Sequence, residues 1–231
     1  MRGDDIHSSV SLEKPPGQPY SQYRTESLMK IAIIGATGNV GTRLVDEALK
    51  RHHAVTGIAR NPSKLAPRTG LSATVGDVTK PDAVIPLLKG HDAIISSLRF
   101  QSADPQQLIE LVRRSGVKRY LVVGGAASLE IAPGQILLDA PNFPPAYKPE
   151  ASAGKAFLDA LRNVKDLDWT FVSPSAFFGP GERTGKFRLS DNTLLTAADG
   201  KSSISYEDYA IAMLDEIESP KHVRGRFTVG Y

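Results

Sequence analysis

Short apolar runs alternate with amphipathic segments along most of this chain. Strands are predicted from the apolar runs at residues 31–34, 54–59, 72–75, 93–97, 119–126, 169–173 and 225–231. Helices are predicted between them, at residues 39–52, 81–88, 104–115, 150–163 and 204–218. The strands are continuous apolar runs, which is typical of a parallel sheet covered by helices on both faces. The pattern therefore predicts an α/β protein with a doubly wound parallel sheet.

The two ends of the chain depart from this pattern. Residues 1–28 are polar and rich in Pro, Ser and Gln, with neither apolar periodicity nor the apolar core of a signal peptide. Because Met29 stands directly before the first strand, we expect 1–28 to be a disordered extension or an added segment. We expect 29–231 to form a single domain. After Pro174 the pattern loosens, so 174–231 is expected to form a small C-terminal appendage on the substrate side.

Composition and charge exclude several classes of protein. The chain has 231 residues, 41% hydrophobic and 23% charged, and it lacks the run of about 18 apolar residues that would span a membrane. Its net charge of +3 comes from scattered Lys and Arg residues rather than a basic stripe, so no nucleic-acid partner is expected. The absence of cysteine excludes thiol catalysis and thiolate metal sites, and it favours a cytoplasmic location. The five histidines lack metal-ligand spacing, so no metal site is expected.

Three glycines follow the first predicted strand in the stretch IAIIGATGNVG, at Gly35, Gly38 and Gly41. Glycine permits a tight turn and a close approach of the backbone to a ligand. The helix that begins at Asn39 directs free N–H groups at this turn, which suits a phosphate. Strand, glycine-rich turn and helix together predict a dinucleotide-binding unit, although the spacing is G-x-x-G-x-x-G. Tight packing of helix on strand is the alternative interpretation, and it explains Gly41 well.

Charged residues after the second and third strands indicate which dinucleotide is bound. An NAD site usually places an acid after the second strand, whereas this chain has Arg60, with Lys64 nearby. Arg60 suits a 2′-phosphate, so NADP(H) is preferred over NAD(H); a solvated charge in a turn is the alternative. Asp77 is placed to accept from the adenine amino group or to cap a turn.

Small residues end the fourth and fifth strands, in SSLR (96–99) and VGGA (123–126). Ligands of open α/β sheets bind beyond the carboxyl ends of the strands. These two segments are therefore expected to let a nicotinamide ribose approach.

Several stretches together resemble a known family. IAIIGATGNVG, IARNPSKL, GDV and LDWTFVSPS are similar to the atypical short-chain dehydrogenases/reductases. The stretch that begins YKPEASAG and continues to ISYEDYA resembles more narrowly the NmrA-like NAD(P)H-binding proteins grouped as NADH–flavin reductases, with biliverdin reductase B more distant. The resemblance covers residues 30–231. It implies a Rossmann fold, NADP(H) in the cleft and a small redox acceptor.

The resemblance also implies roles for particular positions. The pyrophosphate would be held by Gly35, Thr37, Gly38, Asn39 and Val40. The adenosine end would lie on Arg60, Asp77 and Val78, and the nicotinamide end on Ser97, Leu98 and Gly124.

One departure from the family concerns the proton donor. Ordinary short-chain dehydrogenases carry Tyr-x-x-x-Lys, but here Tyr147 is followed four residues later by Ala151. Tyr147 and Lys155 remain catalytic candidates that could meet in the cleft, and Ser128 could donate to a substrate carbonyl. The alternatives are a solvent-facing helix lysine for Lys155 and a turn cap for Ser128.

Flavin or quinone reduction tolerates this departure, because the acceptor has chiefly to be stacked against the nicotinamide and can draw protons from water. Phe177 and Phe178 are expected to form a wall of the substrate cleft, or else to pack in the core. The favoured hypothesis is an NADPH-dependent reductase of a small conjugated acceptor, acting as a monomer or homodimer. A non-catalytic NADP(H) sensor is the second hypothesis, and a nucleotide-sugar epimerase or dehydratase the third.

Overall fold

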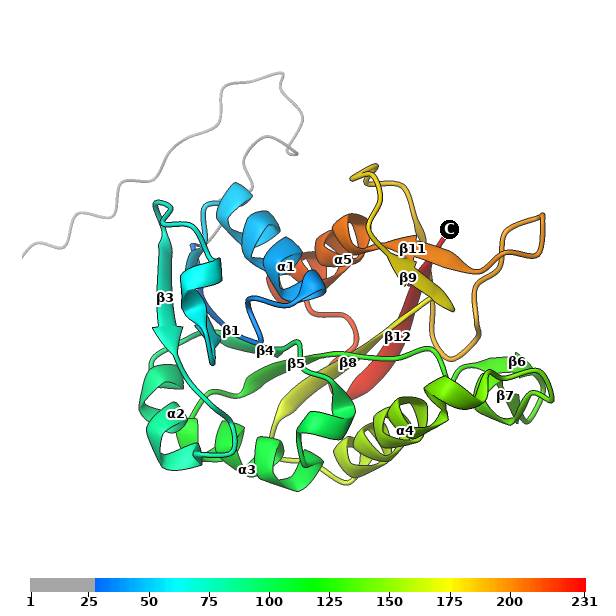
Figure 1. Cartoon of the computed structure of the whole chain (residues 1–231), viewed down its shortest axis with the longest axis horizontal. Helices are drawn as coiled ribbons and strands as arrows, with labels where there is room; N and C mark the ends of the chain where they lie inside the picture. Colours follow the sequence, from blue (N-terminus) through cyan, green and yellow to red (C-terminus); the bar gives the residue numbers. More distant parts are fainter. Residues whose placement is uncertain (1–27) are drawn as a thin grey trace, which may run out of the picture.

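The computed structural model of the chain describes residues 28–231. The expectation for residues 1–28 therefore lies, except for Leu28, outside the described residues. Residues 28–231 are shown in colour in Figure 1.

An eight-stranded sheet forms the centre of the fold, in the order β10-β12-β8-β5-β4-β1-β2-β3 (Figure 1). All neighbouring strands are parallel except β10, which pairs antiparallel with β12. The chain proceeds outward from β1 in one direction and from β4 in the other, which confirms the predicted doubly wound sheet. The strands are β1 (Lys30–Ile34), β2 (Ala54–Ala59), β3 (Leu71–Val75), β4 (Ala93–Ser96), β5 (Arg119–Val123), β8 (Asp168–Pro174), β10 (Arg188–Ser190) and β12 (Gly225–Gly230).

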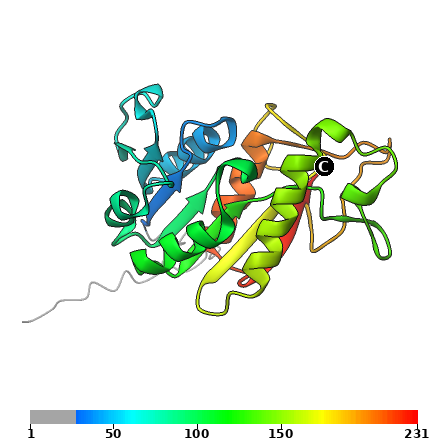
Figure 2. The ribbon, with the colours of Figure 1, turned by 60° about the horizontal axis from the view of Figure 1, so that its bottom comes forward.

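Helices cover both faces of the sheet, as Figures 1 and 2 show. One face carries α1 (Asn39–Lys50) and α5 (Tyr206–Glu218); the other carries α2 (Pro81–Leu88), α3 (Pro105–Ser115) and α4 (Lys148–Arg162). Alternate residues of β1 enter opposite cores: Ile31 and Ile33 pack toward α1 and α5, whereas Ala32 and Ile34 pack toward α2 and α3. Burial on both faces explains why the strand is apolar throughout.

Short elements extend from the carboxyl ends of β5 and β8. A hairpin of β6 (Glu130–Ala132) and β7 (Gln135–Ile136) follows β5, and β9 (Phe177–Gly179) follows β8 and pairs with β11 (Ser203–Ser205). Four 3-10 turns complete the structure, at Pro62–Lys64, Phe100–Ser102, Leu137–Asp139 and Pro145–Tyr147.

The segment after Pro174 is more ordered than its sequence pattern predicts. Residues 173–189, which are rich in Gly, Pro and aromatic residues, are expected to be loop-like, yet they contain β9 and the first two residues of β10. Each of these strands has three residues and pairs with a strand more than twenty residues away, so a local pattern cannot reveal it. The C-terminal segment also supplies α5 and β12, which complete the main sheet and its helical layer.

Two adjacent glycines at the end of β5 differ sharply in their surroundings. A Cβ on Gly124 would lie 2.5 Å from both Phe171 Cε1 and the Val172 carbonyl oxygen, whereas the atom nearest to a Cβ on Gly125 would be Phe100 Cε2 at 3.7 Å. Gly124 therefore allows β5 and β8 to pack closely, and Gly125 has room for a methyl group.

We expect Gly124→Ala to lower the free energy of unfolding by about 1–3 kcal/mol, because the added methyl overpacks the core. Gly125→Ala is the matched control and should change it by less than about 0.5 kcal/mol. Chemical denaturation of both variants measures the difference. Equal stabilities would contradict this account of Gly124.

Candidate functional site

A first cavity, of about 380 Å³, lies beyond the carboxyl ends of β1, β2, β3 and β4. Most of the residues predicted to bind a dinucleotide line it, namely Gly35, Thr37, Gly38, Arg60, Lys64, Asp77, Val78, Ser97 and Leu98. Asn39 and Val40 begin α1 just behind this lining. The structure thus brings together side chains from four separate turns that the sequence assigned to one ligand.

The three glycines of the turn serve different purposes. Gly35 has a left-handed φ of +83°, and a Cβ there would lie 2.2 Å from the Ser97 carbonyl oxygen. A Cβ on Gly41 would lie 2.2 Å from the carbonyl oxygen of Gly35. Tight packing therefore explains these two glycines, whatever is bound. Gly38 has an ordinary φ of −75°, is exposed and lines the cavity, so its missing side chain leaves the backbone open to a ligand.

The turn also fits a phosphate chemically. Gly38 is the N-cap of α1 and provides no capping side chain, whereas Asp104 and Ser205 cap α3 and α5 with side-chain oxygens. The first N–H groups of a helix lack intrahelical partners, and together with the helix dipole they attract an anion. The turn at Gly38 therefore fits a dinucleotide pyrophosphate.

Three cationic side chains border the first cavity: Arg60, Lys64 and Arg99. Within residues 28–231, none of them forms an ion pair or a side-chain hydrogen bond. The sequence analysis assigns no role to Arg99, because it interprets SSLR (96–99) only through its small residues. Arg99 stands at the exit of β4, and its charge could have been read as a second phosphate partner.

Asp77 is engaged in a turn as well as lining the cavity. Its Oδ1 accepts hydrogen bonds from the Thr79 backbone N–H, at 3.0 Å, and from the Thr79 hydroxyl, at 2.9 Å. These bonds lower the pKa of Asp77 below its usual value. Asp77 therefore caps the turn through Oδ1, and Oδ2 is the oxygen that can face a ligand.

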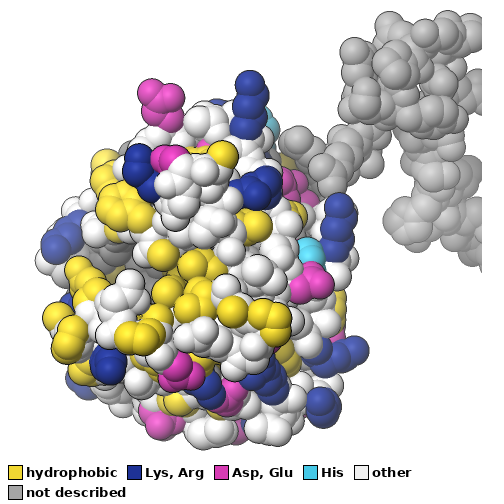
Figure 3. Space-filling model, turned by 90° about the vertical axis from the view of Figure 1, so that its right-hand side faces the viewer, with side chains coloured by type: hydrophobic (Ala, Val, Ile, Leu, Met, Phe, Trp, Pro, Cys, Tyr) yellow, Lys and Arg dark blue, Asp and Glu magenta, His cyan; other side chains and the backbone are white. Residues whose placement is uncertain are grey.

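A second cavity, of about 590 Å³, opens beside the first, beyond the carboxyl ends of β5 and β8. Its walls are mostly apolar, and Figure 3 shows hydrophobic side chains gathered on this side of the molecule. All three catalytic candidates, Ser128, Tyr147 and Lys155, line it, as does Gly124. Gly124 therefore lies in the second cavity rather than among the residues of the first.

The two phenylalanines of β9 have different positions. Phe178 lines the second cavity and packs against the rings of Tyr206 and Tyr209, with centroid distances of 4.7 and 4.6 Å. Phe177 is 69% exposed and lies outside the cavity lining. Only Phe178 therefore forms the expected wall.

Tyr147 and Lys155 share the cavity without bonding to each other. Tyr147 is 66% exposed and precedes α4, and the Lys155 ammonium lies 2.7 Å from Asp159 Oδ2. The Asp159 pair directs the lysine along its own helix, so the two side chains do not reproduce the missing Tyr-x-x-x-Lys pair.

Ser128 has a partner that the sequence did not suggest. Arg226 of β12 donates from Nη1 to the Ser128 carbonyl oxygen, at 3.0 Å, and to its Oγ, at 2.8 Å. An arginine inside the otherwise apolar predicted strand 225–231 was the available signal.

The exit of β4 separates the two cavities. Ser97, Leu98 and Arg99 line the first, and the next residue, Phe100, lines the second. The Glu150 carboxylate on α4 holds this segment by accepting from the backbone N–H groups of Phe100, at 2.7 Å, and Gln101, at 3.1 Å. A ligand that crosses this segment would extend from the cationic cavity to the apolar one.

Comparison with known proteins identifies the family. Residues 35–220 match the NAD(P)H-binding family. The chain belongs to this family. It is 40% identical to the Bacillus subtilis protein YwnB over 215 residues, which cover 87% of this chain and 98% of the relative.

Solved structures of similar proteins agree with this assignment. A Bacteroides thetaiotaomicron protein named a "putative epimerase" is 42% identical, with a TM-score of 0.84, covering 88% of this chain and 97% of that protein. A Streptococcus pneumoniae protein named a "putative NADH-flavin reductase" is 38% identical, with a TM-score of 0.74, covering 87% and 99%. The chain is thus an NAD(P)H-binding Rossmann protein of the atypical short-chain dehydrogenase/reductase type.

No helix in residues 28–231 is long and apolar enough to cross a membrane. The same residues contain no cluster of three or more acidic or histidine side chains arranged to hold a metal ion.

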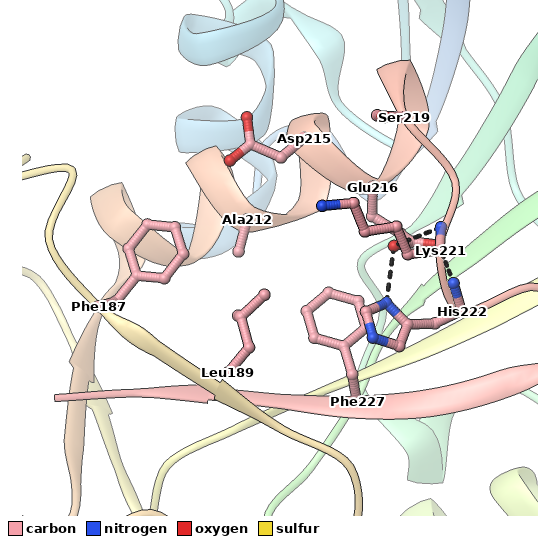
Figure 4. Close-up of a pocket in the computed structure, with 9 residues that line it drawn as sticks. All are labelled: Phe187, Leu189, Ala212, Asp215, Glu216, Ser219, Lys221, His222 and Phe227. Carbon is pink, nitrogen blue, oxygen red and sulfur yellow. Dashed lines mark hydrogen bonds and ion pairs between the residues drawn. The ribbon is translucent and has the colours of Figure 1, made fainter.

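A third cavity, of about 290 Å³, lies between α5, β10 and β12 (Figure 4). Its polar wall is the buried Glu216 carboxylate, which accepts from the backbone N–H and ring Nδ1 of His222, at 2.9 and 2.8 Å, and from the Lys221 N–H. Arg119 of β5 also donates to Glu216, at 2.9 Å. The hydrogen-bonding capacity of this carboxylate is used by protein groups. We therefore interpret Glu216 as a structural residue that joins α5 to the sheet.

We expect Glu216→Ala to lower the free energy of unfolding by about 3–5 kcal/mol, because it leaves the buried Arg119 guanidinium without its counter-ion. Asp215→Ala removes the neighbouring acid, whose half-exposed side chain pairs with Arg51, and should cost less than about 1 kcal/mol. Urea denaturation compares the two. A similar loss from both would show that burial of the pair is unimportant.

Proposed function

We propose that this protein is an NADPH-dependent reductase that transfers hydride to a small conjugated acceptor such as a flavin or a quinone. The observation that carries the proposal is the pair of cavities on either side of residues 97–100. One is cationic and bordered by an uncapped helix, and the other is apolar. The name of the Streptococcus neighbour supports the same reaction class.

The preference for NADPH rests on the charges of the first cavity. Arg60 stands where an NAD site usually carries an acid, and Lys64 and Arg99 stand beside it without protein partners in residues 28–231. A 2′-phosphate would receive charge-assisted hydrogen bonds from such a group of cations. Bound NAD(H) has only a ribose hydroxyl at that position and would leave these charges unused.

Separate groups of residues would bind the cofactor and the acceptor. Gly38 and the start of α1 would hold the pyrophosphate, and Ser97 and Leu98 would face the nicotinamide end. The bound cofactor supplies the hydride. Phe100 and Phe178 present apolar surface to a flat acceptor in the second cavity, and Ser128 offers a hydroxyl to it. Protons reach the reduced acceptor from water, so the reaction needs no Tyr-x-x-x-Lys pair.

An NADP(H) sensor without turnover is the second candidate function. The observation in its favour is that Lys155 is paired with Asp159 and does not bond Tyr147, so the second cavity has no tyrosine and lysine acting together. The same observation weighs against an epimerase, the activity that the Bacteroides neighbour's name indicates.

Turnover separates the reductase from the sensor. NADPH oxidation by the purified protein is measured by absorbance with FMN, FAD or a small quinone, and NADPH binding is measured separately by calorimetry. Oxidation with any of these acceptors supports the reductase. Tight NADPH binding with no oxidation favours the sensor and contradicts the proposal.

We expect Arg60→Ala to raise KM for NADPH by about tenfold or more, since one charge-assisted hydrogen bond to the 2′-phosphate is lost. KM for NADH should stay within about twofold. Arg68→Ala is the control, because Arg68 lies in the same connection but pairs with Asp46 on α1. A parallel rise for both cofactors would contradict the role given to Arg60.

A further inference from the structure

Arg226 is an unusual residue for its place in the sheet. It lies in β12 between Gly225 and the fully buried Phe227, and its backbone is in register with Phe171 of β8. Burial lowers its pKa to about 10, so the guanidinium stays protonated at neutral pH. Arg226 is partly buried, and β12 lies between β10 and β8, so its charge is costly unless its donors are used.

The guanidinium is held as a fork between two segments. Nε and Nη2 donate to the Asn192 side-chain oxygen, at 3.0 and 2.7 Å, and Nη1 donates to the Ser128 carbonyl oxygen and Oγ. Asn192 follows β10, and Ser128 follows β5 and lines the second cavity. Arg226 therefore ties the wall of that cavity to the edge of the sheet.

This contact fixes the direction of the Ser128 hydroxyl. Arginine has only donors, so Ser128 Oγ can only accept from it and must place its own proton elsewhere. No group in residues 28–231 accepts that proton, and Ser128 faces the second cavity. Ser175, which lines the same cavity, has the opposite arrangement: its hydroxyl donates to the Val229 carbonyl oxygen at 3.3 Å.

We propose that Arg226 is a positioning residue that makes Ser128 an obligate hydrogen-bond donor to a carbonyl oxygen of the acceptor. The inference rests on the proposed function and narrows it: the acceptor class is a conjugated carbonyl compound, such as a quinone.

In the overall reaction, NADPH, a proton and a quinone give NADP⁺ and a hydroquinone. The C4–H bond of the nicotinamide breaks as that hydrogen and its electron pair bond to the quinone. The π electron pair that this displaces ends on the carbonyl oxygen at Ser128, which takes its proton from water. Ser128 keeps its own proton and stabilises the developing negative charge, and Arg226 touches neither reactant.

The test uses 4-nitrophenol, whose phenolate oxygen resembles the charged carbonyl oxygen and whose ionisation is visible by absorbance. Its pKa when bound to the whole protein is measured without cofactor. Ser128→Ala should raise this pKa by about one unit relative to the wild type, because a donor to the phenolate is lost. Ser128→Thr keeps the hydroxyl and should restore the wild-type value.

A double-mutant cycle distinguishes an effect of Arg226 through the Ser128 hydroxyl from a direct effect of its charge on the bound phenolate. Arg226→Gln supplies an amide oxygen that can accept the Ser128 proton, so it should raise the bound pKa as Ser128→Ala does. Combined with Ser128→Ala, it should cause no further rise, because it acts through that hydroxyl. Arg226→Lys, which like arginine has only donors, should stay near the wild type. Arg224→Gln is the control, since Arg224 pairs with the half-exposed Asp168.

The outcomes distinguish this inference from the proposed function. Three results would overturn the inference, even if NADPH oxidation is observed. They are additive pKa shifts in the double variant, an unchanged pKa in Ser128→Ala, and no binding of 4-nitrophenol to the wild type. The expected cycle would support it even if NADPH oxidation is absent, and the proposed function would then fail alone. If a quinone is reduced, Ser128→Ala and Arg226→Gln should each lower kcat about tenfold while KM for NADPH stays unchanged. Thermal unfolding checks that each variant is folded.

Discussion

Close backbone contact at the turn between β1 and α1 is the constraint on which the site depends. The Cα of Gly35 faces the carbonyl oxygen of Ser97, and the Cα of Gly41 faces the carbonyl oxygen of Gly35, both at distances that exclude a side chain. These contacts fix the start of α1 beside the exit of β4. Because that exit also separates the two cavities, this one turn determines how they are placed relative to each other.

The charges of the protein are arranged in two distinct ways around this turn. Away from the cavities, buried charges are neutralised by protein. Burial opposes the ionisation of Glu47, but hydrogen bonds from Arg183 and Arg51 outweigh it and lower its pKa. At the first cavity, by contrast, Arg60 and its cationic neighbours have no such partners in the described residues. Three exposed cations that gather at one cavity without ion-pair partners in the described residues are suited to an anion.

The second cavity is built from segments that are distant in sequence. Ser128 follows β5, Lys155 lies on α4, Phe178 lies on β9, and Arg226 reaches Ser128 from β12. Its mostly apolar walls, and the Ser128 hydroxyl that Arg226 orients, are consistent with the flat acceptor proposed above. The short strands β9 and β11 hold Phe178 against Tyr209 and so give this wall a fixed position.

The sequence by itself determined the doubly wound sheet and the location of the glycine-rich turn. Both follow from local physics: strands buried on two faces must be apolar throughout, and a tight turn before a helix needs glycine. Most residues of the first cavity were predictable for the same reason, since each lies at the carboxyl end of a strand that the pattern reveals.

Only the tertiary structure decided which glycines serve packing, which phenylalanine lines the cavity and what Ser128 bonds. Gly124 lies against Phe171 of the neighbouring strand, and Ser128 bonds Arg226 from 98 residues away. Such contacts depend on how distant segments pack, and nothing in the local pattern encodes them. The direction of one hydroxyl proton therefore depends on the folded sheet as a whole, whereas the glycine-rich turn is specified by eleven consecutive residues.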